Sequence, residues 1–196
     1  MSAVTMAKRL FDITFSIIGL LIFSPLYLII FLGIKLSCEG PVIFKQERIG
    51  KNGKPFYIYK FRTMIVNNEL DGIPQLAEPN DQRLTKFGKF LRSHHLDELP
   101  QLWNVLIGDM SFIGYRPERK YFIDQIMEHD PRYVELYQMR PGITSYATLY
   151  NGYTDTMEKM LRRLELDLYY MEHQSWELDL SIIFKTFTKI AFGKKI

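Results

Sequence analysis

Residues 13–34, ITFSIIGLLIFSPLYLIIFLGI, form a run of 22 positions without a charged side chain. At about 1.5 Å per residue, a helix of this length is roughly long enough to cross the hydrocarbon layer of a membrane. A cleaved signal peptide is the alternative, because Lys8 and Arg9 resemble its basic start. The apolar run is too long for a signal peptide, however, and no small-residue cleavage site follows it. The sequence therefore predicts a helix inserted in a membrane.

Ser24 and Pro25 lie in the middle of this run. Proline removes a backbone donor and its ring crowds the carbonyl of Leu21, so the helix bends or breaks there, and Ser24 can bond back to a freed carbonyl. Basic residues flank the run on both sides: Lys8 and Arg9 before it, and Lys35, Lys45, Arg48 and Lys51 after it. Because such residues favour the cytoplasmic side, we predict a re-entrant helix that enters and leaves one leaflet. A kinked helix that spans the membrane is the alternative.

The rest of the chain has the length of one small domain. We place the membrane-inserted part at residues 1–38 and a cytoplasmic domain at residues 39–196. The formal net charge of +3 is too small for a nucleic-acid binder that relies on phosphate neutralisation, but it suits an anionic membrane surface or a phosphorylated substrate. Cys38 is the single cysteine, which excludes an intrachain disulfide and a Cys-rich zinc site.

The cytoplasmic part is predicted to be α+β and mostly helical. Residues 42–49 and 56–64 predict the two strands of a β-hairpin, in which Lys60 and Arg62 alternate with aromatic residues. One face of the hairpin can then pack while the other meets phosphate; a solvated cationic face is the alternative. Further predicted elements are a loop at 67–82, helices at 83–92, from about 97 onward, 119–129, 155–173 and 176–192, a strand at 111–113, and an extended stretch from 143 to 150.

The last predicted helix, 176–192, carries its apolar residues on one face. This pattern is typical of an amphipathic helix that lies on a lipid surface, and a helix that packs on a protein core is the alternative.

Asp97 and Glu98 lie at the start of a predicted helix, because Pro100 is tolerable only in a first turn. Their side chains diverge by about 100°, so they cannot be the facing acid and base of a glycosidase. One carboxylate can attack an electrophile while the other holds a divalent cation; simple helix capping is the alternative. Basic residues in turns nearby favour chemistry on phosphate: Arg83, Lys86, Arg92, Arg116 and Arg140.

Other nucleotide chemistries lack their motifs in this chain. It contains no G-x-x-x-x-G-K-[ST] loop, no G-x-G-x-x-G and no Asp-x-Asp, and His94 and His95 lack a metal-ligand spacing. A carboxylate pair, a cation and several arginines are instead typical of phosphoryl transfer.

The sequence resembles the monotopic phosphoglycosyl transferases, the bacterial sugar transferases that start glycan assembly on polyprenol phosphate. The motifs that carry the resemblance run in one order through nearly the whole chain. They are Lys8-Arg9 with Asp12, Ser24-Pro25, YKFRTM at 59–64, DQRLTKFG at 81–88, LDELPQL at 96–102, NVL at 104–106, GDMSFIG at 108–114, Arg116-Pro117 and RPGIT at 140–144. Tyr115 and Ser145 stand where the family commonly has proline and glycine.

The resemblance implies a re-entrant membrane helix at the cytoplasmic face of the bacterial inner membrane, Mg²⁺ as cofactor, and transfer in two steps. Asp97 would attack the sugar-bearing phosphate of a UDP-sugar and expel UMP, while Glu98 helps to hold Mg²⁺. Polyprenol (undecaprenyl) phosphate would then take the phosphosugar from Asp97. The substrate-binding residues expected on this basis are Lys60, Arg62, Arg92, Arg116 and Arg140.

Two other functions remain open from the residues alone. One is a different membrane phosphotransferase, although the multi-aspartate signature of the headgroup transferases is missing. The other is a non-enzymatic, membrane-anchored basic adaptor in which the acidic pair only caps a helix.

Overall fold

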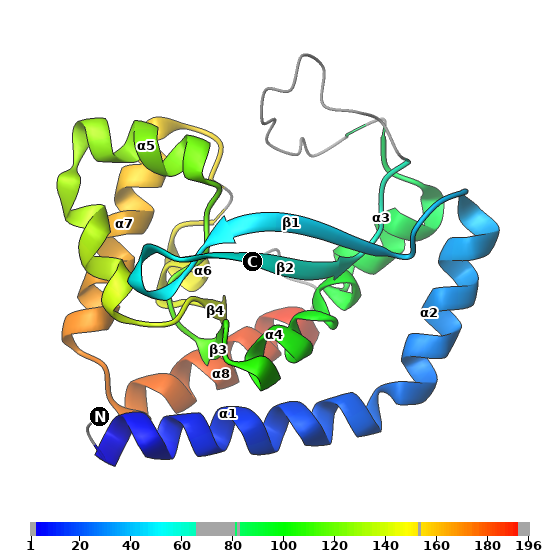
Figure 1. Ribbon diagram of the computed structural model, residues 1–196, viewed down its shortest axis with the longest axis horizontal. Helices are drawn as coiled ribbons and strands as arrows, with labels where there is room; N and C mark the ends of the chain where they lie inside the picture. Colours follow the sequence, from blue (N-terminus) through cyan, green and yellow to red (C-terminus); the bar gives the residue numbers. More distant parts are fainter. Residues whose placement is uncertain (1–2, 66–80, 82, 153, 192–196) are drawn as a thin grey trace.

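Two N-terminal helices, α1 (Ala3–Ile22) and α2 (Ser24–Ser37), meet at Phe23 with a bend of 60° in the computed structural model (Figure 1). The structure describes residues 3–65, 81, 83–152 and 154–191. Pro25 lies in the first turn of α2, where its missing N–H costs no helical hydrogen bond, and Oγ of Ser24 donates to the carbonyl oxygen of Leu21 at 2.8 Å. The predicted kink is confirmed. Within the described residues no single helix is long and apolar enough to cross a membrane, whereas the bent pair passes that test together.

The predicted hairpin is also confirmed. Strands β1 (Ile43–Ile49) and β2 (Pro55–Phe61) are antiparallel, with Ile43 opposite Phe61 and Ile49 opposite Pro55. The turn between them contains the short 3₁₀ helix η1 (Lys51–Gly53), in which Asn52 has a φ of 60°. The hairpin runs across the middle of the molecule, above α1 in the view of Figure 1.

The remaining elements follow in chain order. They are α3 (Lys86–Ser93), η3 (Leu96–Glu98), α4 (Gln101–Ile107), β3 (Ser111–Ile113), α5 (Lys120–His129), η4 (Pro131–Gln138), β4 (Gly142–Thr144), α6 (Tyr146–Tyr150), α7 (Met157–Glu172) and α8 (Trp176–Ala191). Strands β3 and β4 are parallel. The α+β class and most predicted elements are confirmed, but residues 143–150 are not simply extended, because Ser145 caps the short helix α6. The loop predicted at 67–82 lies almost entirely outside the described residues.

The two ends of the hairpin lie in separate hydrophobic clusters, and Ile58 in the middle of β2 belongs to a third. Phe61 of β2 is buried with Ile30 and Ile34 of α2 and with Leu91 of α3. At the other end of the hairpin, Ile49 is buried in a cluster built mainly from α5, η4 and α7. The hairpin therefore joins the bent helix pair to the helical remainder of the chain.

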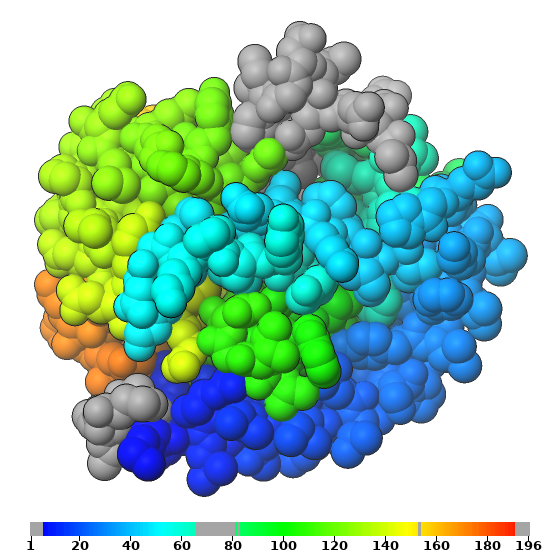
Figure 2. All heavy atoms as spheres, in the orientation of Figure 1, coloured from blue at the N-terminus to red at the C-terminus, as the bar shows by residue number. Residues whose placement is uncertain are grey.

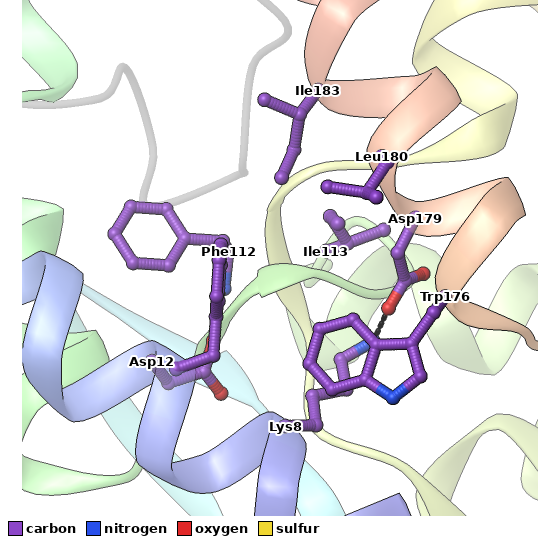
Figure 3. A pocket seen from close by; sticks show the side chains of 9 residues that line it. Lys8, Asp12, Phe112, Ile113, Trp176, Asp179, Leu180 and Ile183 are labelled. Carbon is purple, nitrogen blue, oxygen red and sulfur yellow. Dashed lines mark hydrogen bonds and ion pairs between the residues drawn. The ribbon is translucent and has the colours of Figure 1, made fainter.

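Helix α1 is fastened to α8 by a partly buried ion pair. Nζ of Lys8 lies 2.9 Å from Oδ2 of Asp179 and donates to Oη of Tyr170 at 2.7 Å. Figure 3 shows Lys8 and Asp179 facing each other, with Trp176 and Leu180 of α8 beside them. Helix α8 is amphipathic as predicted. It buries Ile182 and exposes Leu180, Phe184 and Phe187.

Asp12, one turn further along α1, binds β3. Its Oδ1 accepts hydrogen bonds from Oγ of Ser111 and from the backbone N–H of Phe112, both at 3.1 Å. The polar side of α1 is thus used for contacts with the rest of the chain.

Gly88 allows α3 to lie directly against the chain that leaves β2. A Cβ atom at this position would overlap the carbonyl oxygen of Thr63. Because backbone cannot move away as a flexible side chain can, we expect Gly88→Ala to destabilise the fold by about 1–3 kcal/mol. Thermal unfolding in detergent measures this. Lys89→Ala, at the exposed neighbouring position, is the control and should unfold close to the wild-type temperature.

Candidate active site

Asp97 and Glu98 occupy the 3₁₀ turn η3, one turn before α4. The chain enters this turn through His95, whose φ of 54° is left-handed, and the backbone continues with i→i+3 hydrogen bonds such as Leu99 N to Leu96 O at 3.4 Å. The prediction that the regular helix starts near Asp97 is wrong by about one turn, since α4 begins at Gln101, directly after Pro100.

Glu98 forms an ion pair with Lys60 of β2, whose Nζ lies 2.6 Å from Oε1. Both side chains are largely shielded, with relative exposures of 18% and 21%. Burial raises the pKa of Glu98, but the positive charges of Lys60 and Arg116 outweigh this effect and lower it to about 2. Glu98 is therefore a carboxylate at any physiological pH.

Asp97 is buried, with only 7% of its surface exposed. Burial is the main cause that raises its pKa, and the neighbouring charge of Glu98 adds to it, against the opposing charges of Lys60 and Arg92. The pKa values of the two adjacent carboxyl groups are thus shifted in opposite directions, upward for Asp97 and downward for Glu98. Pairs whose environments separate their pKa values in this way commonly divide chemical roles.

Arg92, in the last turn of α3, places its positive charge near the acidic pair. Its Nε donates to Oγ1 of Thr63 at 3.0 Å, which fixes the guanidinium, and its charge acts on Asp97. The structure therefore brings Arg92 and Lys60, on two different elements, to the same pair of carboxylates.

Arg116 lies in the turn after β3, and its charge acts on Glu98. The turn is fastened by Glu118, which accepts from Nη1 of Arg48 at 3.1 Å and from Nη1 of Arg163 at 2.5 Å. Tyr115 is fully buried, and its carbonyl oxygen accepts from Gly142 N at 2.8 Å. Packing therefore fixes the backbone before Arg116 in place of a proline ring.

Arg62 and Arg140 have no contact that connects them with the acidic pair. Nη2 of Arg62, which is buried, donates to the carbonyl oxygen of Cys38 at 3.0 Å. Nε of Arg140 donates to the carbonyl oxygen of Gly108 at 2.8 Å, at the opposite end of α4. Their binding of substrate stays a prediction, and the contacts present are structural.

The acidic pair also fits the chemistry of Mg²⁺. This ion is usually held by one or two carboxylates together with substrate phosphates. Within the part of the chain that the structure describes, no group of three or more His, Cys, Asp or Glu side chains is placed to hold a metal ion. Glu98, beside Asp97, supplies a carboxylate of the kind that such a phosphate-assisted site uses.

The sequence profile of the bacterial sugar transferases matches residues 3–193. The chain belongs to this family. Two relatives are the UDP-N-acetylgalactosamine-undecaprenyl-phosphate N-acetylgalactosaminephosphotransferase of Aeromonas hydrophila, 44% identical over 95% of this chain, and the UDP-glucose:undecaprenyl-phosphate glucose-1-phosphate transferase of Klebsiella pneumoniae, 46% identical over 93%. The chain spans 44% and 39% of the length of these two proteins. The exopolysaccharide production protein PSS of Rhizobium leguminosarum bv. phaseoli is 42% identical over 91% of this chain and 92% of its own length.

In this sugar transferase, the residues that hold the site arginines in place were not anticipated. Glu118 directly follows the Arg116-Pro117 turn, and a carboxylate beside such a turn was the available signal. Arg163 gave no signal in the sequence, and the motif at 59–64 gave no indication that its Thr63 would bind Arg92, because only the tertiary structure brings these residues together.

In Lys60→Met, the stability of the protein should fall less than in the wild type when the pH is lowered from neutral into the acid range. The pKa of folded Glu98, about 2, lies below its ordinary value of 4.5, so the ion pair stabilises the fold above that value and the contribution is lost as pH falls toward 2. We expect the wild type to exceed Lys60→Met in Tm most at neutral pH, with the difference shrinking below about pH 4.5. Thermal unfolding across this range measures the difference.

Lys45→Met is the control for this series. Lys45 is exposed and lies over the ring of Tyr59, 5.6 Å from its centroid, and forms no ion pair with an acidic side chain among the described residues. Its substitution should change Tm little at every pH. A Tm difference for Lys60→Met that stays constant down to low pH would contradict the proposed electrostatic coupling.

Proposed function

We propose that this sugar transferase moves a sugar-1-phosphate from a UDP-sugar to polyprenol (undecaprenyl) phosphate and releases UMP. The observation that carries the proposal is the buried Asp97 beside the Glu98–Lys60 ion pair, with Arg92 and Arg116 acting on the same two carboxylates. The names of the Aeromonas and Klebsiella relatives describe this reaction for two different sugars, so the proposal is for the class of donor and not for one sugar.

The reaction proceeds in two displacements at one phosphorus atom. An oxygen of Asp97 bonds to the sugar-bearing phosphorus, and the bond to the bridging oxygen breaks, so UMP leaves with that oxygen. A phosphate oxygen of the lipid carrier then bonds to the same phosphorus, and the bond to Asp97 breaks, which restores the carboxylate. One pyrophosphate linkage is consumed and another is formed, so the residues serve mainly to lower the barriers.

Each residue near the pair has a defined task in this proposal. Arg92 and Arg116 bind donor phosphate oxygens through their guanidinium forks, and Lys60 keeps Glu98 ionised. Glu98 and the substrate phosphates would hold Mg²⁺, which supplies positive charge against the developing negative charge on phosphate.

We further propose that the bent pair α1–α2 is a re-entrant membrane element at the cytoplasmic face of the bacterial inner membrane. Residues 1–38 would form this inserted part and residues 39–196 the catalytic domain. Apolar side chains exposed on α2, α4 and α8 supply a surface for lipid: Leu28, Ile29 and Leu32, Trp103 and Ile107, and Leu180, Phe184 and Phe187. Lipid contact explains why such large apolar side chains remain exposed.

The product of the proposed reaction, a sugar linked to the lipid carrier through pyrophosphate, would begin capsule, O-antigen, exopolysaccharide or glycoprotein glycan assembly.

Asp97→Asn should abolish UMP release while the protein remains folded and membrane-bound, because an amide cannot act as the nucleophile. Wild type quenched with UDP-sugar and Mg²⁺, but without acceptor, should carry a phosphosugar on Asp97 that mass spectrometry detects. Glu98→Gln should still form some adduct but require more Mg²⁺, since a ligand charge is lost. An adduct on another residue, or transfer in a ternary complex without any adduct, would disprove the covalent mechanism.

The topology is tested by cysteine labelling in a Cys38→Ser background. Re-entry places both Ser2→Cys and Lys54→Cys in the cytoplasm, so a membrane-impermeant maleimide should label neither in intact cells and both after permeabilisation. Lys54 is the control, because the turn of the hairpin is cytoplasmic in either topology. Labelling of Ser2→Cys from outside would instead establish a spanning helix.

A further inference from the structure

Tyr27 of α2 contacts two segments that form the acidic site, the one that follows Glu98 and strand β2. Its Oη donates a hydrogen bond to the carbonyl oxygen of Leu99 at 2.6 Å, and Leu99 directly follows Glu98. Its ring packs edge-on against Phe61, with 5.2 Å between the centroids, and Phe61 directly follows Lys60. One side chain of the bent helix pair thus touches the segment with the acidic pair and the strand with its cation.

Arg9 of α1 holds the far end of the same segment. Its Nη1 and Nη2 donate to the carbonyl oxygens of Val105 and Leu106 at 2.6 and 2.8 Å. These are carbonyl groups of the last turn of α4, beyond the reach of the helix's own i→i+4 donors, and that of Val105 also accepts from Gly108 N at 3.2 Å. Between the two attachments, Gly19 of α1 lies close to Leu102, since a Cβ on the glycine would be 3.0 Å from Cδ1. Figure 2 shows α4, in green, between the hairpin, in cyan, and α1, in blue.

The bend between α1 and α2 sets the distance between these two attachments. Tyr27 lies four residues beyond Phe23, about 6 Å along α2 at about 1.5 Å per residue. A change of about 10° in the bend would therefore move the backbone of Tyr27 by about 1 Å, and its hydroxyl by more. A misplacement of about 1 Å can cost an enzyme on the order of a hundred-fold in rate.

We propose that Tyr27 and Arg9 are positioning residues, through which the bent helix pair fixes Asp97 and Glu98 relative to Lys60. The inference rests on the proposed function, because it assumes that these carboxylates carry the reaction. Neither positioning side chain touches the reacting groups; both act through backbone carbonyls of residues 99–106.

Tyr27→Phe tests the first attachment, because it removes the hydroxyl and keeps the ring against Phe61. The carbonyl oxygen of Leu99 already accepts from Leu102 N at 3.0 Å, so the fold does not depend on the lost bond to satisfy it. With the full chain in lipid nanodiscs, we expect kcat for UMP release to fall roughly ten-fold, equivalent to about 1.4 kcal/mol. KM for the UDP-sugar should change by less than about two-fold, because the donor contacts remain.

Arg9→Lys tests the second attachment. Lysine keeps the positive charge that topology requires but cannot donate to two carbonyl oxygens as a guanidinium fork does. It should lower kcat in the same direction as Tyr27→Phe, again with little change in KM.

Tyr170→Phe is the matched control. Tyr170 Oη donates to Oδ1 of Asp179 at 2.5 Å and accepts from Lys8, so this variant also removes a hydroxyl that binds a neighbouring element. Its loss should lower Tm while leaving kcat at the wild-type value. If Tyr27→Phe loses kcat only in proportion to Tm, or not at all, the positioning role is wrong.

Hydrogen exchange gives a readout that does not depend on activity. The amides of Leu99 and of residues 101–107 should exchange faster in Tyr27→Phe and Arg9→Lys than in wild type, and their exchange should be unchanged in Tyr170→Phe. If the wild type releases UMP but neither variant alters kcat or exchange, the inference fails and the proposed function stands. If the wild type releases no UMP from any UDP-sugar, the proposed function fails, and unchanged exchange would then reject the attachment as well.

Discussion

The attachment of α4 to the bent helix pair is the constraint on which the acidic site depends. Helix α4 has seven residues and no side-chain N-cap, so it is too short to be stable without tertiary contacts. Arg9 binds its last carbonyls, and Asn104 anchors it to β2 by accepting from Tyr59 N at 3.1 Å and donating to the carbonyl oxygen of Tyr57 at 2.7 Å. The turn with Asp97 precedes this helix directly and therefore inherits its position.

The charges around that turn come from elements far apart in the sequence. Lys60 belongs to β2, Arg92 to α3, and Arg116 to the turn after β3. Nζ of Lys60 is held by Glu98 and Nε of Arg92 by Thr63, so these two positive charges are in place before any substrate arrives. A site prepared in this way does not have to reorganise when negative charge develops on phosphate. Such preorganised electrostatic stabilisation is the main source of catalysis in phosphoryl transfer.

Local signals in the sequence were sufficient for the bend at Ser24 and for the hairpin, because proline chemistry and the alternation of basic with aromatic residues act over a few positions. They were also sufficient to select Asp97 and Glu98 as a pair. They failed where tertiary contacts decide. Residues 143–150 were predicted to be extended but contain the short helix α6, and the helix predicted from about residue 97 begins at Gln101. Arg140 met the same sequence criterion as Arg116, yet its Nε binds the carbonyl oxygen of Gly108. Which carbonyl or carboxylate an arginine reaches depends on the packing of distant elements, and no spacing in the chain encodes it.

Both ends of the bent pair α1–α2 are bound to the rest of the chain, and these contacts require the bend. Arg9 near the start of α1 binds α4, and the carbonyl oxygen of Cys38, directly after α2, accepts from Arg62 of the same domain. Helix α1 packs along α4 and β3, and the bend of 60° turns α2 out of that line toward the hairpin and α3, where Ile30 and Ile34 are buried. A helix that continued straight from α1 would carry Tyr27 away from the carbonyl oxygen of Leu99, to which its Oη donates. The break at Phe23 therefore allows both helices of the pair to contact the segment that follows the acidic pair.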